Sequence, residues 1–212
     1  MLGRAARAAP RRRRGRAARR ARADAAPAGY DLPRLLADLG LGGGRGAELG
    51  VWRGKFSAHL LASLPDLAEL LLVDAWDVVD VYQSRADQDA ALAEASRAVA
   101  PFGRRARVLR NWTADAAALV ADGSLDFVYV DASHDYRNAR ADLMDWWPKL
   151  RVGGLFAGND YASGYVPAAG YTFGVKDAVD EFAAVRDLRV HATREDDPDG
   201  AAPDWFILKC GA

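Results

Sequence analysis

The chain has 212 residues, with 29 basic and 29 acidic side chains, and half of it is apolar, as in an ordinary folded protein. No apolar run approaches the roughly 20 residues that a membrane-spanning helix needs, so we expect no membrane partner. The single cysteine, Cys210, excludes an intrachain disulfide and fits a reducing compartment.

Residues 1–27 form a leader that differs from the rest of the chain. Residues 1–23 hold ten arginines and no acid, so the remainder has 19 basic and 29 acidic residues. The leader lacks the apolar side chains of a core, and we expect it to be disordered. It resembles a chloroplast or mitochondrial transit peptide, but a solvated tail on a cytoplasmic protein stays open. A nucleic-acid arm is a third interpretation, although no aromatic residue interleaves the arginines.

Residues 28–212 are predicted to form one domain in which strands and helices alternate. A short helix is predicted first, over 31–39. The predicted strands are 46–51, 70–75, 106–111, 125–131, 155–159, 189–193 and 204–209. The later predicted helices are 54–64, 84–100, 113–121 (with Thr113 as N-cap), 136–150 and 174–186. A turn is predicted at 151–154 and a loop at 161–171.

This alternation predicts an α/β fold, a Rossmann-like doubly wound sheet that is mostly parallel and has helices on both faces. No helix separates the last two strands, so one antiparallel strand is expected near the C-terminus. Ligands bind such sheets at the carboxyl ends of the strands. Acids or amides stand at the carboxyl ends of five of the predicted strands, which is more than solubility requires: Glu48, Asp74, Asn111, Asp131 and Asn159-Asp160.

The strongest local signal is the segment 46–57, GAELGVWRGKFS. Gly50 permits a sharp turn and a close approach of the backbone to a ligand. Trp52 replaces the middle glycine of the dinucleotide fingerprint, and Glu48 would repel a pyrophosphate. Glu48 suits a ligand with cationic groups, such as S-adenosylmethionine, which carries a sulfonium and an ammonium. Asp74 has the right position for ribose hydroxyls, although nicotinamide-binding folds share such an acid.

These residues resemble the first-strand pattern of class I S-adenosylmethionine-dependent methyltransferases, and within them the small-molecule O-methyltransferases. That group includes the catechol and caffeoyl-CoA enzymes and the antibiotic-tailoring sugar-type enzymes. The resemblance runs from about residue 46 to about residue 182. It implies that Gly50, Trp52 and Ser57 line the methionine end of the cofactor and that Asp74 binds its ribose. Trp76 or Trp112 would then lie on the adenine face.

A second constellation joins Asp131 to the Asn159-Asp160 pair, at the ends of two strands that the fold places side by side. Carboxylate and amide oxygens suit Mg²⁺ or a similar divalent ion, and no Cys/His cluster suggests zinc. Family members have an Asp at the position of Asp131 and an Asp-Asn pair where this chain has Asn159-Asp160. The order is inverted here, although some tailoring members place Asp second, followed by Tyr. Asp131 is also assigned to the cofactor site.

His134 follows Asp131 by three residues, where the caffeoyl-CoA-like enzymes have a Lys that serves as base. A His can take this role because part of it is unprotonated at neutral pH. A helix cap for Asp131 and a structural loop position for His134 are the alternatives.

The sequence thus predicts a metal-assisted O-methyltransferase that acts on a small hydroxylated molecule. A nicotinamide-dependent oxidoreductase and a non-catalytic interaction module with this fold are the alternatives. A nucleic-acid methyltransferase is disfavoured, because Asp-Ala-Ser-His stands where base-nitrogen enzymes often have Asn/Asp-Pro-Pro-aromatic. Dimers are common in the group that the chain resembles, so a homodimer is one expected assembly.

Overall fold

The structure is a computed structural model that describes residues 31–78, 83–166, 170–193 and 202–211. The predicted leader, 1–27, lies outside the described residues. Among the helices that are described, none combines the length and the apolar character needed to cross a membrane.

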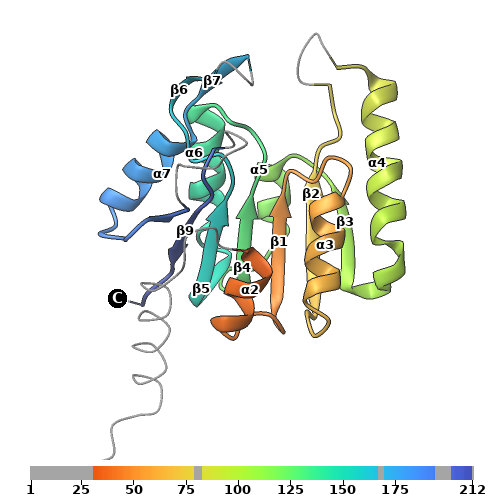
Figure 1. Cartoon of the computed structure of the whole chain (residues 1–212), viewed down its shortest axis with the longest axis horizontal. Coiled ribbons are helices and arrows are strands. Elements are labelled where there is room, and N and C mark those ends of the chain that lie inside the picture. The colour runs from red at the N-terminus through yellow and green to blue at the C-terminus, as the bar shows by residue number, and fades with distance from the viewer. Residues whose placement is uncertain (1–30, 79–82, 167–169, 194–201, 212) are drawn as a thin grey trace, which may run out of the picture.

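Seven strands form one sheet in the order β3-β2-β1-β4-β5-β9-β8 (Figure 1). The bounds are β1 Arg45–Leu49, β2 Glu69–Asp74, β3 Ala106–Arg110, β4 Leu125–Val130, β5 Leu150–Gly158, β8 His191–Ala192 and β9 Trp205–Leu208. Five neighbouring strands pair in parallel: β3, β2, β1, β4 and β5. Strand β9 is antiparallel to both of its neighbours, β5 and β8. The predicted doubly wound, mostly parallel sheet is therefore confirmed.

Helices cover both faces of the sheet, and a short hairpin stands above its carboxyl edge (Figure 1). The helices are α2 Leu32–Asp38, α3 Lys55–Ser63, α4 Arg85–Val99, α5 Thr113–Ala118, α6 Tyr136–Trp146 and α7 Val175–Ala184, with a 3-10 segment, η1, at Ala100–Arg105. The hairpin consists of β6 Gly164–Val166 and β7 Tyr171–Phe173, paired antiparallel.

Strand alternation divides the core into two apolar layers. In β2, Leu70 and Leu72 pack into one layer, whereas Leu71 and Val73 pack into the other. The first layer includes buried residues of α2, α3 and α4, and the second includes buried residues of α5, α6 and α7. Each fully buried Leu or Val contributes about 1.5–3 kcal/mol relative to exposure, so both faces hold the sheet in place. Because helices bury both faces of the sheet, its polar side chains are found at the ends of the strands.

Three local predictions were wrong. Strand β5 begins at Leu150, inside the predicted helix 136–150 and before the predicted turn, because Leu150 pairs with Leu125 across a register shift in β4. The residue that caps α5 is Trp112, and Thr113 is the first helical residue. The predicted loop 161–171 contains β6 and the first residue of β7.

Candidate active site

The end of β1 buries an acid against the first turn of α3. Glu48 is 2% exposed, and Ser57 donates a hydrogen bond to its Oε2 at 2.5 Å. Burial raises the pKa of Glu48 to about 8, and the charges of Asp131 and Asp74 act in the same direction. Burial thus favours the protonated form of Glu48 well above the ordinary pKa of a glutamate.

Gly50 directly follows β1 and lies against Asp131, the residue after β4. Its φ is +84°, and a Cβ there would lie 1.9 Å from the carbonyl oxygen of Asp131. The two strand ends are also joined by the backbone N–H of Asp131, which donates to Leu49 at 2.7 Å. Only glycine fits this position, because a side chain would force the two strand ends apart.

The Asp74 carboxylate orders the loop that follows β1. Its Oδ2 accepts hydrogen bonds from the backbone N–H groups of Val51 and Trp52, each at 2.9 Å. Its Oδ1 accepts from the backbone N–H of Trp76 at 2.8 Å. Asp74 thus fixes the loop after β1 and the start of the loop after β2. The sequence predicted that the ribose of the cofactor binds at this place.

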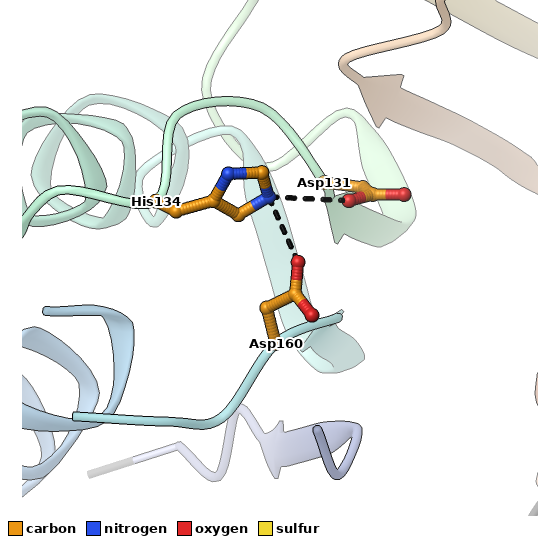
Figure 2. A group of neighbouring side chains, drawn as sticks. All are labelled: Asp131, His134 and Asp160. Atoms are coloured by element: carbon orange, nitrogen blue, oxygen red, sulfur yellow. Dashed lines mark ion pairs between the residues drawn. The ribbon is translucent and has the colours of Figure 1, made fainter. Parts of the chain in front are cut away.

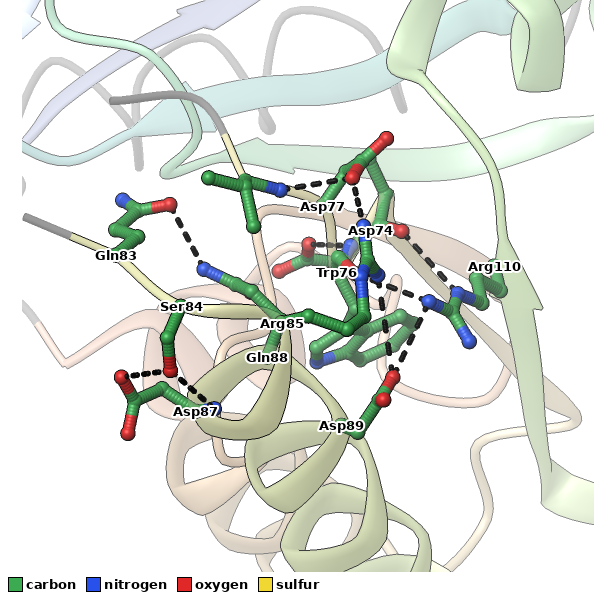
Figure 3. Close-up of polar contacts among 12 residues, drawn as sticks. Asp74, Trp76, Asp77, Gln83, Ser84, Arg85, Asp87, Gln88, Asp89 and Arg110 are labelled. Carbon is green, nitrogen blue, oxygen red and sulfur yellow. Dashed lines mark hydrogen bonds and ion pairs between the residues drawn. The ribbon is translucent and has the colours of Figure 1, made fainter. Parts of the chain in front are cut away.

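Trp76 is held at the start of the β2–α4 connection by hydrogen bonds to other segments, and Figure 3 shows Arg85 and Arg110 beside it. Its backbone φ is +42°, an unusual conformation for tryptophan. Its carbonyl oxygen accepts from Arg85 at 2.8 Å and from Arg110 at 3.2 Å, and its indole N–H donates to the carbonyl of Trp52 at 2.8 Å. These tertiary contacts hold a conformation that a tryptophan does not adopt by itself.

The three predicted aromatic cofactor residues differ in accessibility. Trp52 and Trp112 are 47% and 50% exposed, whereas Trp76 is fully buried. Trp52 lies in the loop after β1, and Trp112 follows β3, so both stand at the carboxyl edge. Trp52 and Trp112 therefore offer ring surface to a ligand, and Trp76 supports the loop beneath them.

Asp131, His134 and Asp160 converge on one point (Figure 2). His134 Nε2 lies 2.8 Å from Asp160 Oδ2 and 4.0 Å from Asp131 Oδ1. One ligand atom from each of the three residues lies within 4.8 Å of the others, which is a spacing that a metal ion can bridge. Asp160 has a φ of +57°, so its backbone is held in a strained conformation at this site.

The electrostatics of this cluster favour a cation. Burial, and then the charge of Asp160, raises the pKa of Asp131. Burial lowers the pKa of His134, but the hydrogen bond and charge of Asp160 outweigh it and the net shift is upward. Asp131 and His134 therefore both hold a proton more tightly than usual, as expected where carboxylates are crowded together.

Asn159, the third predicted metal ligand, forms a side-chain hydrogen bond with Asp131. It lines a small pocket together with Asp131, His134 and Trp205. All three predicted ligands are therefore neighbours, with Asn159 orienting Asp131.

Sequence reasoning missed one residue of the site and one contact. Asp204 precedes β9, and burial together with the charges of Asp131 and Asp160 raises its pKa to about 6. An antiparallel strand begins where its parallel neighbour ends, so the start of the last predicted strand was a usable signal. Tyr171 lies at the end of the predicted loop 161–171, where the sequence suggested a substrate contact, and its contact with His134 was not predicted.

The comparisons with known proteins fit this geometry. The family model for a methyltransferase domain matches residues 47–161, which span β1 to the residue after Asp160. No curated protein matches the chain in sequence.

Solved structures show the same fold at low sequence identity. An O-methyltransferase from Bacillus cereus in complex with SAH is 16% identical, with a TM-score of 0.60 and coverage of 92% of this chain and 91% of that one. A candidate caffeoyl-CoA O-methyltransferase from Staphylococcus aureus is 13% identical, with a TM-score of 0.61 and coverage of 89% and 88%. Spermidine synthase from Thermotoga maritima is 15% identical, with a TM-score of 0.53 and coverage of 78% and 53%. The fold is therefore shared by enzymes of different chemistry.

Proposed function

Because this chain belongs to the methyltransferase-domain family and has the class I S-adenosylmethionine-dependent fold, we propose that it methylates a hydroxyl oxygen of a small molecule. The proposed donor is S-adenosylmethionine, and the proposed helper is a divalent cation such as Mg²⁺. The observation that carries the proposal is the convergence of Asp131, His134 and Asp160 beside the Gly50 turn.

The donor side of this proposal rests on β1 and β2. Glu48 and Ser57 offer a carboxyl and a hydroxyl for the cationic methionine end, and Gly50 permits close approach of the backbone. Asp74 is proposed to add ribose hydroxyls to the backbone groups that it already binds. Trp112 is proposed for the adenine face, because half of its surface is open to solvent.

The residues present fit a divalent ion. Asp131 and Asp160 supply hard oxygen ligands, Asn159 supplies an amide, and the raised pKa of Asp131 shows that its negative charge is under-compensated. Asp160 uses Oδ2 for His134, which leaves Oδ1 for the ion. When bound, the ion would lower the pKa of the acceptor hydroxyl.

His134 is the proposed base. Its Nε2 takes the hydroxyl proton as the acceptor oxygen bonds to the methyl carbon and the bond from that carbon to sulfur breaks. The products are the methylated acceptor and S-adenosylhomocysteine, and the proton stays on the imidazole. Asp160 stabilises the resulting imidazolium through the contact that it already makes. General-base catalysis of this kind accelerates a reaction by about 10² to 10⁴-fold.

The test combines binding and turnover. Calorimetric titrations with S-adenosylhomocysteine, and separately with NADH, are run with Mg²⁺ and with chelator. Methyl transfer from labelled S-adenosylmethionine to a panel of phenols, sugars and other hydroxylated metabolites is then measured. We expect S-adenosylhomocysteine to bind with or without metal, turnover to require the metal, and Asp131→Ala to abolish turnover.

Binding of NADH in place of S-adenosylhomocysteine would overturn the assignment. Full turnover of Asp131→Ala in chelator would remove the metal from the mechanism while keeping the methyltransferase.

A further inference from the structure

We propose that Tyr171 is a positioning residue for His134, so that the β6–β7 hairpin completes the acceptor side of the active site. This inference rests on the proposed function, because it deepens the role given to His134 there.

Both ring nitrogens of His134 have partners. The Tyr171 hydroxyl lies 2.7 Å from Nδ1, and Asp160 Oδ2 lies 2.8 Å from Nε2. Turning the ring would break both contacts at once. Tyr171 therefore fixes which nitrogen faces the carboxylates.

The hairpin also packs against the face of the imidazole. The ring centroid of His134 lies 5.0 Å from that of Phe173 and 5.5 Å from that of Tyr171. The two hairpin rings stack on each other at 4.9 Å with an interplanar angle of 7°. Phe173 is buried, so the stacked pair packs against the imidazole from a fixed position.

The end of the hairpin is fixed to the loop that carries His134. The backbone N–H of Gly174 donates to the carbonyl of His134 at 2.8 Å. A Cβ on Gly174 would lie 2.5 Å from the backbone nitrogen of Tyr136. This close approach brings β7 to a fixed position over His134, 37 residues away from Tyr171 in the sequence.

The chemistry requires such a partner. The Tyr171 hydroxyl can pair with Nδ1 in either state of the neutral ring. While Nε2–H donates to Asp160, the Tyr171 hydroxyl donates to Nδ1. For Nε2 to accept a proton, the ring must carry its hydrogen on Nδ1, and the Tyr171 oxygen then accepts that N–H. After transfer the proton from the acceptor hydroxyl is on Nε2, and Tyr171 stays neutral. The segment that matches the methyltransferase family model ends at residue 161, before the hairpin. Tyr171 therefore holds His134 from outside the matched segment.

The test compares Tyr171→Phe with Tyr165→Phe. Both tyrosines lie on the hairpin and are exposed, but only Tyr171 bonds to His134 among the described contacts. We expect Tyr171→Phe to lower kcat by roughly 10- to 100-fold, the usual effect of losing a partner that orients a histidine, with the KM for S-adenosylmethionine unchanged. Tyr165→Phe is expected to match the wild type in both.

A second measurement does not depend on turnover. The chain has three histidines, so nitrogen-15 NMR resolves their rings, and His134→Gln assigns the signal of interest. In chelator, at a pH where the ring is neutral, we expect His134 to carry its hydrogen on Nε2, beside Asp160, in the wild type and in Tyr165→Phe, with Nδ1 accepting a hydrogen bond from the Tyr171 hydroxyl. In Tyr171→Phe we expect the Nδ1 signal to move toward that of an unprotonated ring nitrogen that accepts no hydrogen bond.

Unchanged His134 signals in Tyr171→Phe would overturn the inference, and so would altered signals with an unaltered kcat. A wild-type chain that neither binds S-adenosylhomocysteine nor transfers a methyl group would overturn the proposed function. In that case the NMR comparison would still decide whether Tyr171 sets the state of the His134 ring.

Discussion

Glu48 shows at the scale of one residue how burial prepares a site for a cation. Its carboxyl is enclosed between β1 and α3, and Ser57 is its hydrogen-bond donor. Burial keeps it protonated up to about pH 8, well above the ordinary value of 4.5. In the proposed function an incoming ammonium or sulfonium would favour the ionised carboxylate, so ligand binding would lower this pKa and expel the proton.

We therefore predict that S-adenosylhomocysteine binding at pH 7 releases close to one proton from Glu48. Calorimetry in buffers with different ionisation enthalpies measures the number released. Glu48→Gln keeps the acceptor for Ser57 and cannot ionise, so its release should fall by nearly one proton. Equal proton release by the two proteins would show that Glu48 does not face the ligand charge.

At the scale of elements, the short helix α5 depends on its contact with α6. Asp142, on α6, is buried and forms a side-chain hydrogen bond with Thr113 at the start of α5. The indole N–H of Trp146 donates to the carbonyl of the same threonine at 3.1 Å. A six-residue helix is marginal by itself, so these long-range contacts are what hold it at the sheet.

The ionisation of Asp142 should oppose folding at neutral pH. Burial raises its pKa to about 6, from 3.8. Between about pH 3.8 and about pH 6 the folded state therefore holds a proton that the unfolded state has lost, and above that range folding buries a charged carboxylate. The stability from this group is complete below about pH 3.8 and is lost as the pH rises through about 6.

We predict that Asp142→Asn stabilises the protein at pH 7.5 by on the order of 1–3 kcal/mol. The gain should vanish near pH 4, and denaturant unfolding at the two pH values measures it. Asp66→Asn, at an exposed turn, is the control and should change neither value. A variant that is less stable at pH 7.5 would show that the hydrogen bond to Thr113 outweighs the burial of charge.

At the scale of the whole molecule, the site draws on both layers of the fold. Glu48 and Ser57 lie on the side of α3, whereas His134 precedes α6 and is held by the hairpin before α7. The four strands β2, β1, β4 and β5 present their acids along one edge. A ligand that spans this edge stabilises the sheet as a unit.

We predict that S-adenosylhomocysteine at 100 times its Kd stabilises the protein by about 2.7 kcal/mol and raises Tm by roughly 5–10 °C. Scanning calorimetry measures the shift. Trp52→Ala removes a half-exposed ring, so the ligand-free Tm should stay the same while the shift becomes smaller at the same ligand concentration. An unmoved Tm at that concentration would mean that the ligand does not bind the folded state in preference to the unfolded chain.

The sequence by itself determined the sheet, its mostly parallel order and the acids at its carboxyl edge. These features are local, because strand and helix periods and the residue after each apolar run can be read without knowing what packs against what. Glu48, Asp74, Asp131 and Asp160 all lie at neighbouring strand ends in the structure, and the roles assigned to them stay predictions.

The tertiary structure alone decided which partners those acids meet. Asp204 comes near the charges of Asp131 and Asp160 because β9 runs antiparallel to β5. The ring of Trp76 is buried because it packs into the first apolar layer, and Arg85 and Arg110 bind its backbone carbonyl. Tyr171 reaches His134 because Gly174 brings the hairpin onto the β4–α6 loop. Contacts between distant segments depend on how the elements pack and in which direction the strands run. The local sequence around one of the two partners does not reveal either.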